Sequence, residues 1–522
     1  MRFTGCTRAS RSISIPSGKN PGSIFQSLAN PYLNANLKRR REERGYTLYD
    51  RSEGFAGPIK HVREKRGAIG VLVDQHAGDK GTWCPFFDRL ASTTSLPAMM
   101  SLRCHAPLLP IAVFDGDGPA RWRLVCYPPV SSGEAKPSID GITAMVNIAV
   151  EFMVRSAPHN WFWVHNRWKT PQPDFLLSRY RRGIVLPKGY DAGRLQAFSL
   201  LVRSPNWLGD ACMAFPAVRA LKRGRPDLKL KVLCPAKLVE LWQSVPEVDD
   251  IIAKQNDDGI EAVATKVREA GPFDAAILFT NSTRSTLEVW RSAIPRIVGY
   301  RGSLRSLLLH DVAPEPSGAE PPEHHAHRYL RLAEHCGAKK DDPALFDSPE
   351  PKQGEHSTLL GICAGAEYGP AKRWPLERYA EVARQLSTRW PEIEWRFFGA
   401  PGETAMGEEL SAKLQGVKHR NLVGKTNLSQ LIQNLKQCRL LLTNDTGTMH
   451  LAAALGVPTV SIFGSTEPVL TSALGERHRI VRHHVPCSPC FKRECPFGHY
   501  ECMTGVTVER VEAEVAKALT AK

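Results

Sequence analysis

The stretch LLTNDTGTMHLAAALGVPTVSIFG, residues Leu441–Gly464, contains an apolar run, a short polar loop, a segment rich in Ala and Leu, and a second apolar run. The two apolar runs have the length of buried strands, and the segment between them has the length of a helix. A strand, a helix and a second strand in this order form the βαβ unit of a parallel sheet. This stretch therefore predicts an α/β fold.

The same alternation recurs from about residue 196 to the end of the chain. Apolar runs near 198–202, 230–234 and 275–279 precede amphipathic stretches at 210–223, 236–244 and 283–293. A second series begins near residue 359, beyond two segments rich in Pro, Gly and Glu, residues 313–325 and 347–357. Repeated βαβ patterns of this kind predict two doubly wound domains, residues 196–345 and 346–522, with a cleft between them.

The N-terminal third is less regular. Residues 170–195 mix Pro, Gly and basic residues without a sustained period and are interpreted as a linker. For residues 1–185 we expect a mixed α/β domain, in which GAIGVLVDQ (67–75) and APLLPIAVFD (106–115) form buried strands. No segment approaches the roughly 18 uninterrupted apolar residues that a membrane span requires. We therefore do not expect an integral membrane protein.

The positive charge of the chain is unevenly distributed. Of the net charge of +16, residues 1–200 contribute an excess of 13, and KRRREER (38–44) is the densest stretch. This excess fits either a solvated surface or attraction to an anionic membrane face. Nucleic acid is the weaker interpretation, because no aromatic residues are interleaved with the basic ones. The N-terminus lacks an apolar signal segment, so we expect a cytoplasmic setting, in which the 13 Cys are thiols or metal ligands.

The segment LVRSPNWLGD, residues Leu201–Asp210, ends an apolar run and places a carboxylate on the first turn of a predicted helix. Ligands of open parallel sheets bind at the carboxyl ends of the strands, and Asp210 lies just beyond one. Gly209 allows a large ligand to approach the backbone. The alternative is that Asp210 only satisfies free amides at the helix start.

The loop NDTGT in the opening stretch also begins a predicted helix. Small residues at a helix N-terminus suit a diphosphate, because the free amides and the helix dipole favour negative charge. Asp445 is a poor ligand for phosphate and a good acceptor for sugar hydroxyls, whereas His450 lies one turn into the helix and faces either the cleft or the core. The alternative is an ordinary turn capped by Asn444 or Asp445.

Two further strand ends open into loops rich in Gly and Ala. In ICAGAEYGPAKRWP (362–375), Lys372 and Arg373 can neutralise a leaving diphosphate. In FFGAPGE (397–403), Glu403 can accept ribose hydroxyls. No P-loop and no GxGxxG motif follows a predicted strand, which argues against nucleoside triphosphate hydrolysis and nicotinamide chemistry.

Together these four segments resemble the ADP-heptose:lipopolysaccharide heptosyltransferases, glycosyltransferases of the GT-B fold with two Rossmann-like domains. The motifs NWLGD, AKRWP, GAPGE and NDTGTMHLAAALGVPTVSIFGSTEP occur in the family's order and spacing, from about Phe198 to the C-terminus. The resemblance implies an inverting transfer of heptose from ADP-heptose to a lipid A-core acceptor, without a required cofactor. It implies these roles: Asp210 as general base, Lys372 and the Thr446–Gly447 amides on the diphosphate, Glu403 on the ribose, Asp445 on the heptose, and Gly209 and His450 as further substrate-binding residues.

The N-terminal third has a resemblance of its own. GVLVDQHAGDKGTWCPFFDRLAST (70–93) and APHNWFWVHNRWK (157–169) resemble part of the lipid A biosynthesis acyltransferases. That family uses a catalytic His followed, after four residues, by an acidic residue, upstream of the DQ segment. Here the only His upstream of Asp74 is His61, and Arg66 occupies the acidic position. We therefore interpret this third as a truncated acyltransferase-like domain and expect no acyl transfer.

A segment near the C-terminus is rich in cysteine. CSPCFKRECPFGHYECM (487–503) contains four cysteines that could hold zinc tetrahedrally: Cys487, Cys490, Cys495 and Cys502. The proposed transfer itself requires no metal, so this segment is interpreted as a structural element.

The sequence thus predicts a cytoplasmic glycosyltransferase, peripheral on the inner face of the inner membrane, whose partners are ADP-heptose, the lipid acceptor and an anionic membrane surface but not nucleic acid. One rival hypothesis is a non-catalytic module that binds lipid surfaces through the basic N-terminal third. A second is a transferase that uses another nucleotide sugar.

Overall fold

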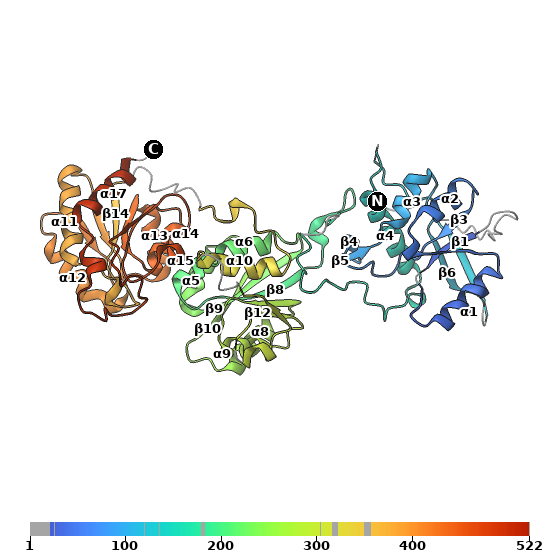
Figure 1. The fold of residues 1–522 in the computed structure, drawn as a ribbon, viewed down its shortest axis with the longest axis horizontal. Helices are drawn as coiled ribbons and strands as arrows, with labels where there is room; N and C mark the ends of the chain where they lie inside the picture. Colours follow the sequence, from blue (N-terminus) through green and yellow to red (C-terminus); the bar gives the residue numbers. More distant parts are fainter. Residues whose placement is uncertain are drawn as a thin grey trace. The chain divides into compact units, whose positions relative to one another are not determined.

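The computed structural model describes residues 21–25, 27–118, 121–134, 136–178, 183–302, 304–315, 322–348 and 357–520. The chain divides into two compact units, Met1–Ala197 and Phe198–Lys522, and each is described by itself (Figure 1). The three domain ranges expected from the sequence remain predictions.

In its described residues, the first unit combines three small sheets with helices. A parallel sheet has the order β2-β1-β3, and two antiparallel hairpins pair β4 with β5 and β6 with β7. The strands are β1 (Pro21–Phe25), β2 (Thr47–Asp50), β3 (Ala68–Gly70), β4 (Thr82–Phe86), β5 (Arg89–Thr93), β6 (Ile111–Asp115) and β7 (Trp122–Cys126), and the helices are α1 (Pro31–Glu42), α2 (Ala56–Arg63), α3 (Leu96–Cys104) and α4 (Ile139–Ser156). The core forms where the apolar face of α4, with Ile142, Val146 and Val150, packs with Phe86 and Ala98.

The expectation of two buried strands in this unit is wrong. The segment 67–75 forms only the three-residue strand β3, whose residues are exposed or partly exposed. Strand β6 in the segment 106–115 buries Phe114 but leaves Ile111 and Val113 exposed. An apolar run is buried only where other elements cover both faces of its strand, and β6 pairs with β7 alone.

The described part of the second unit contains two parallel sheets of six strands each. Their orders are β10-β9-β8-β11-β12-β13 and β16-β15-β14-β17-β18-β19, so each sheet has the 3-2-1-4-5-6 order of a Rossmann domain. We call the part with the first sheet the first lobe and the part with the second sheet the second lobe. The prediction of two Rossmann-like domains is confirmed.

The elements of the first lobe agree closely with the predicted alternation. They are β8 (Phe198–Arg203), α5 (Leu208–Met213), α6 (Phe215–Lys222), β9 (Leu228–Pro235), α7 (Val239–Gln243), β10 (Asp250–Lys254), α8 (Ile260–Ala270), β11 (Ala275–Leu278), α9 (Thr283–Trp290), β12 (Ile297–Tyr300), β13 (Asp311–Ala313) and α10 (His325–His335). Strand β8 lies in the middle of its sheet and is almost wholly buried, which explains its continuous apolar sequence.

The second lobe repeats this plan. Its elements are β14 (Leu359–Cys363), α11 (Leu376–Arg389), β15 (Glu394–Phe397), α12 (Thr404–Lys413), β16 (His419–Asn421), α13 (Leu428–Gln437), β17 (Leu440–Asn444), α14 (Gly447–Ala454), β18 (Thr459–Phe463), α15 (Pro468–Thr471), β19 (His478–Arg482), α16 (Glu501–Thr504) and α17 (Val508–Thr520). The opening stretch of the sequence is the unit β17-α14-β18, and β17 and β18 pair in parallel.

Candidate functional site

The strand order of each sheet in the second unit reverses at one point. The reversal lies between β8 and β11 in the first lobe and between β14 and β17 in the second. Ligands of doubly wound sheets bind outside the carboxyl ends of the strands at such a point. Asp210 follows β8, Lys372 follows β14, and Asp445 directly follows β17. The topology therefore places these three predicted residues at the two expected binding edges.

Asp210 lies in the first turn of α5. The N-cap of this helix is Trp207, so Asp210 does not fill the capping position. Its Oδ1 accepts a hydrogen bond from the Tyr329 hydroxyl at 3.5 Å, which comes from α10. Burial raises the pKa of Asp210, while His325, Tyr329 and Lys372 oppose the rise. The result is a carboxylate of increased basicity at the edge of the first sheet.

Helices α5 and α14 of the two lobes meet through small residues. A Cβ atom at Gly209 would lie 2.9 Å from Cδ2 of His450, and a Cβ atom at Gly447 would lie 3.1 Å from Cβ of Leu208. The space that we expected a ligand to use at Gly209 is thus taken by an imidazole. His450 is itself buried, and this burial lowers its pKa to about 4, so the ring is neutral at physiological pH.

Lys372 and Asp445 form an ion pair. Lys372 Nζ lies 2.6 Å from Asp445 Oδ2, and the Thr466 hydroxyl donates a hydrogen bond of 2.7 Å to the same oxygen. Asp445 is only 5% exposed. At the start of α14, Thr446 is the N-cap and its side chain accepts from the Met449 amide. A cation, a buried carboxylate and a helix start therefore meet at the edge of the second sheet.

Glu403 has one carboxylate oxygen without a partner. Its Oε2 accepts a hydrogen bond from the Ala400 amide at 2.9 Å, whereas none of the described residues donates a hydrogen bond to its buried Oε1. The carboxylate lies against the loop after β14, where a Cβ atom at Gly365 would clash with Oε1. An unpaired carboxylate oxygen can accept a hydrogen bond from a ligand hydroxyl.

Substitution of Gly365 by Ala tests the position of Glu403. The added methyl group displaces the Glu403 carboxylate, but the chain should stay folded because the clash is with the end of a flexible side chain. If Glu403 holds the ribose, we expect the affinity for ADP, measured by calorimetry, to fall about tenfold, which is the scale of one hydrogen bond to a charged group. The matched control is Gly402→Ala, since a Cβ atom at Gly402 meets nothing within 4 Å. Unchanged ADP affinity in Gly365→Ala would contradict the assignment.

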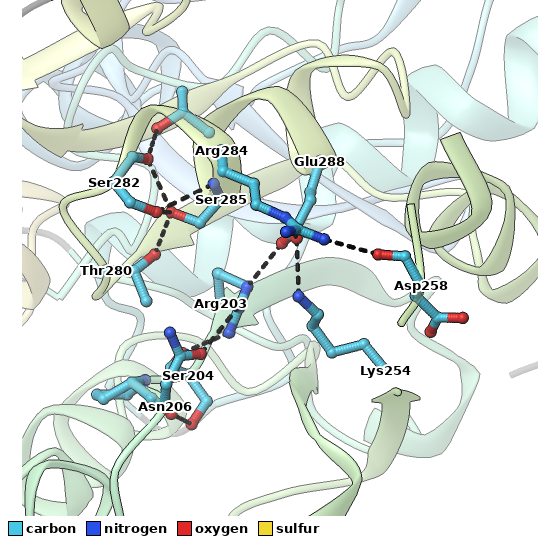
Figure 2. A network of polar contacts seen from close by, with 12 residues as sticks. Arg203, Ser204, Asn206, Lys254, Asp258, Thr280, Ser282, Arg284, Ser285 and Glu288 are labelled. Atoms are coloured by element: carbon cyan, nitrogen blue, oxygen red, sulfur yellow. Dashed lines mark hydrogen bonds and ion pairs between the residues drawn. The ribbon is translucent and has the colours of Figure 1, made fainter. Parts of the chain in front are cut away.

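A cluster of cations that the sequence analysis missed lies at the carboxyl edge of the first sheet. Figure 2 shows three basic side chains around the buried Glu288: Lys254 at 2.8 Å, Arg203 at 3.3 Å and Arg284 at 3.6 Å. Arg203 and Lys254 are the last residues of β8 and β10. The sequence feature that could have identified them is their position at the ends of apolar runs, where parallel strands bind ligands. Three cations around one carboxylate leave a positive charge at this edge.

Arg305 lies close to the same edge. Its side chain is 1% exposed, and Nη1 donates a hydrogen bond of 3.0 Å to Asn281 Oδ1 in the loop after β11. None of the described residues accepts a hydrogen bond from its Nε or Nη2. A buried guanidinium without a carboxylate is unfavourable, and an anion bound beside it would lower this cost.

The four C-terminal cysteines line one pocket, together with His499. Cys487 Sγ lies 3.9 Å from His499 Nε2. Burial raises the pKa of Cys495, but hydrogen bonds from the backbone amides of residues 497–500 outweigh it and lower this pKa. Within the described part of the chain, no three His, Cys, Asp or Glu side chains are grouped to hold a metal ion.

The cysteine segment packs against the loop that carries Lys372. The Tyr368 hydroxyl donates to the Phe491 carbonyl at 2.8 Å, and the Ala371 amide donates to the Arg493 carbonyl at 3.0 Å. Both carbonyls belong to the stretch between Cys490 and Cys495, and they hold the short turn that ends in Lys372. The cysteine segment therefore stabilises the position of the loop that carries Lys372.

Two family models match the chain. Residues 261–501 match glycosyltransferase family 9 (heptosyltransferase), and residues 17–170 match bacterial lipid A biosynthesis acyltransferase. No helix among the described residues has the length and apolar character needed to cross a membrane.

Individual relatives agree with the first match. Lipopolysaccharide heptosyltransferase 2 of Salmonella typhimurium is 32% identical over an alignment of 346 residues, which covers 62% of this chain and 98% of the relative. The structure of the ADP-heptose lipopolysaccharide heptosyltransferase II of Escherichia coli is 29% identical with a TM-score of 0.52, over 62% of this chain and 98% of that one. A family 9 glycosyltransferase structure from Veillonella parvula, at 21% identity and a TM-score of 0.55 over 62% and 98% of the two chains, shows the common fold.

Proposed function

The chain belongs to glycosyltransferase family 9, the heptosyltransferases, and on that premise we propose that it transfers heptose from ADP-heptose to the inner core of lipopolysaccharide with inversion at the anomeric carbon. ADP-heptose is the donor named for the Escherichia coli relative. The observation that carries the proposal is the pair of Rossmann-like lobes with Asp210 at one switch point and Lys372 and Asp445 at the other.

The proposed reaction is a single displacement. Asp210 removes the proton of an acceptor hydroxyl, and the oxygen attacks the anomeric carbon of the heptose. The bond from this carbon to the diphosphate oxygen breaks, and its electron pair leaves with ADP. Lys372 and the amides at the start of α14 stabilise the negative charge of the leaving diphosphate, so the proposed chemistry requires no metal.

The other donor contacts follow from the free groups of the second lobe. Glu403 accepts a hydrogen bond from the ribose through its unpaired Oε1. Asp445 accepts from heptose hydroxyls, and the diphosphate takes over part of the interaction that Lys372 now makes with Asp445. The neutral His450 and Gly209 contribute by holding α5 against α14, which keeps Asp210 near the donor edge.

The acceptor side of the proposal rests on the cations of the first lobe. We place acidic groups of the lipid-linked acceptor near Lys254 and Arg284, and near Arg305 beside the loop after β11, because these side chains carry more positive charge than Glu288 neutralises. The basic first unit would attract an anionic membrane face. We therefore place the enzyme on the inner face of the inner membrane, where its lipid acceptor is accessible.

The pH dependence of the reaction follows from the raised pKa of Asp210. The base must be ionised, so we expect kcat/KM to fall tenfold per pH unit once the pH drops below this pKa. Because burial raises the pKa above the usual 3.8, the fall should begin at a higher pH than for an exposed Asp. The measurement is the pH profile of kcat/KM, with Asp210→Asn as control. A residual activity of that variant with the same pH profile would contradict the role of Asp210.

Transfer assays with a panel of donors separate the proposal from its rivals. Product formed with ADP-heptose in large excess over that formed with other nucleotide sugars supports it. Preference for another nucleotide sugar would favour the second transferase. Vesicle binding without any transfer would favour a non-catalytic module.

A further inference from the structure

The β6–β7 hairpin of the first unit exposes an apolar face. Three pairs of residues lie opposite each other across the two strands: Ile111 and Cys126, Val113 and Leu124, and Asp115 and Trp122. Alternate residues of a strand point to the same side, so these side chains share one face. Leu109, which lies just before β6, extends this face. The large apolar side chains of the face are 46–69% exposed: Leu109, Ile111, Val113, Trp122 and Leu124. We call these five residues the hairpin face.

The opposite side of the hairpin is held by the body of the unit. In β6, the side chain of Phe114 points to the side opposite Val113 and Asp115, and it is only 7% exposed. The guanidinium of Arg123 lies 5.6 Å from the centre of the Phe114 ring. The hairpin thus packs on the unit through Phe114 on one side and exposes its apolar side chains on the other.

A neighbouring loop adds further exposed apolar side chains. The Asn160 amide donates a hydrogen bond of 2.8 Å to Asp115 Oδ2 at the end of β6, which fixes the start of this loop beside the hairpin. The next residues, Phe162, Trp163 and Val164, are 49–85% exposed. Trp163 is held in place because its Nε1 donates to the Pro158 carbonyl at 2.7 Å.

The composition of this surface favours a lipid partner. Trp side chains are enriched where protein meets the bilayer interface, because the ring is apolar and its N–H is polar. The first 200 residues carry an excess of 13 positive charges, which complements an anionic leaflet better than it does a second copy of the same basic unit.

We propose that the hairpin face, with the loop 162–164, enters the interfacial region of an anionic bilayer. The apolar side chains contact the upper acyl chains, and basic residues of the positively charged N-terminal part of the chain contact the headgroups. This inference specifies the membrane contact of the proposed function, but it does not depend on sugar transfer.

The test compares the full chain with Trp122→Ser/Leu124→Ser in sedimentation with vesicles of phosphatidylethanolamine and phosphatidylglycerol. Both side chains are exposed, so the variant should fold normally, with an unchanged melting temperature. We expect its vesicle affinity to fall about tenfold or more, since the variant removes two of the exposed apolar side chains that would leave water on insertion. The matched control is Leu72→Ser, because Leu72 is exposed in the same unit but lies outside the hairpin and the loop.

Two further conditions separate apolar insertion from charge attraction. Raising the salt from 0.1 M to 1 M shortens the Debye length from about 10 Å to about 3 Å, which should weaken binding of all variants but preserve the difference between wild type and the hairpin variant. Vesicles without phosphatidylglycerol should bind the wild type more weakly.

Three outcomes would overturn the inference. They are no vesicle binding by the wild type, equal binding by the hairpin variant, and a dimer in light scattering that the substitutions dissolve while vesicle binding stays unchanged. A failure here is distinct from a failure of the proposed function, because transfer to a delipidated core acceptor would not change in the hairpin variant.

Discussion

Replacement of Asp210 by Asn is expected to lower the turnover number by about 100-fold or more, the scale of a positioned general base. The affinity for ADP-heptose should stay nearly unchanged, because the donor contacts of the proposal come from the second lobe. Turnover with saturating substrates and calorimetry with ADP-heptose measure the two quantities. Near-normal turnover would remove Asp210 from the catalytic role.

The stability of this variant provides a control. Because the pKa of Asp210 is higher in the folded than in the unfolded chain, its negative charge destabilises the fold at neutral pH. Replacing Asp210 by the uncharged Asn should therefore leave the melting temperature equal or higher at neutral pH. A loss of turnover in Asp210→Asn is then not a folding defect. Asp341→Asn is the matched control, because Asp341 is exposed in a loop after α10 and should keep full activity.

Replacement of Lys372 by Ala is expected to weaken the binding of both ADP and ADP-heptose about 10- to 100-fold. The lost contact is to the diphosphate that both ligands contain, and a hydrogen bond to a charged group contributes about 1.5–3 kcal/mol. Calorimetry with ADP alone measures the effect without turnover. Unchanged ADP affinity would show that Lys372 does not contact the diphosphate.

The ion pair with Asp445 demands a second variant in this experiment. Without Lys372, the buried Asp445 keeps only Thr466 as its described partner, and the unpaired charge should lower the melting temperature. In Lys372→Ala/Asp445→Asn the charge is removed, so stability should recover while ADP affinity stays low. Lys413→Ala removes a cation from an exposed ion pair of the same lobe and should change neither quantity.

The sequence predicts most of the second unit because a parallel sheet covered on both faces produces continuous apolar runs. The apolar runs that form β8, β14 and β17 could be recognised as buried strands from the sequence. The position of Asp210 and Lys372 after such runs placed them at sheet edges, since the carboxyl ends of parallel strands share one edge.

The contacts between elements distant in the sequence could not be predicted. Tyr329 reaches Asp210 from 119 residues away, and periodicity does not say which helix faces which strand end. The packing of His450 against Gly209 requires that two lobes meet, which no local pattern encodes. The same limit explains the error at β6, because an apolar run does not reveal whether another element covers it.

The most direct test of the central claim is the product of the wild-type chain with ADP-heptose and a heptose-deficient core acceptor. Mass spectrometry measures the addition of sugar, and NMR measures the configuration of the new linkage. We predict that a single heptose is added, with the anomeric configuration inverted relative to the donor and with one ADP released per transfer. No heptosylated product under conditions where the chain binds ADP-heptose, or a product with retained configuration, would contradict the account.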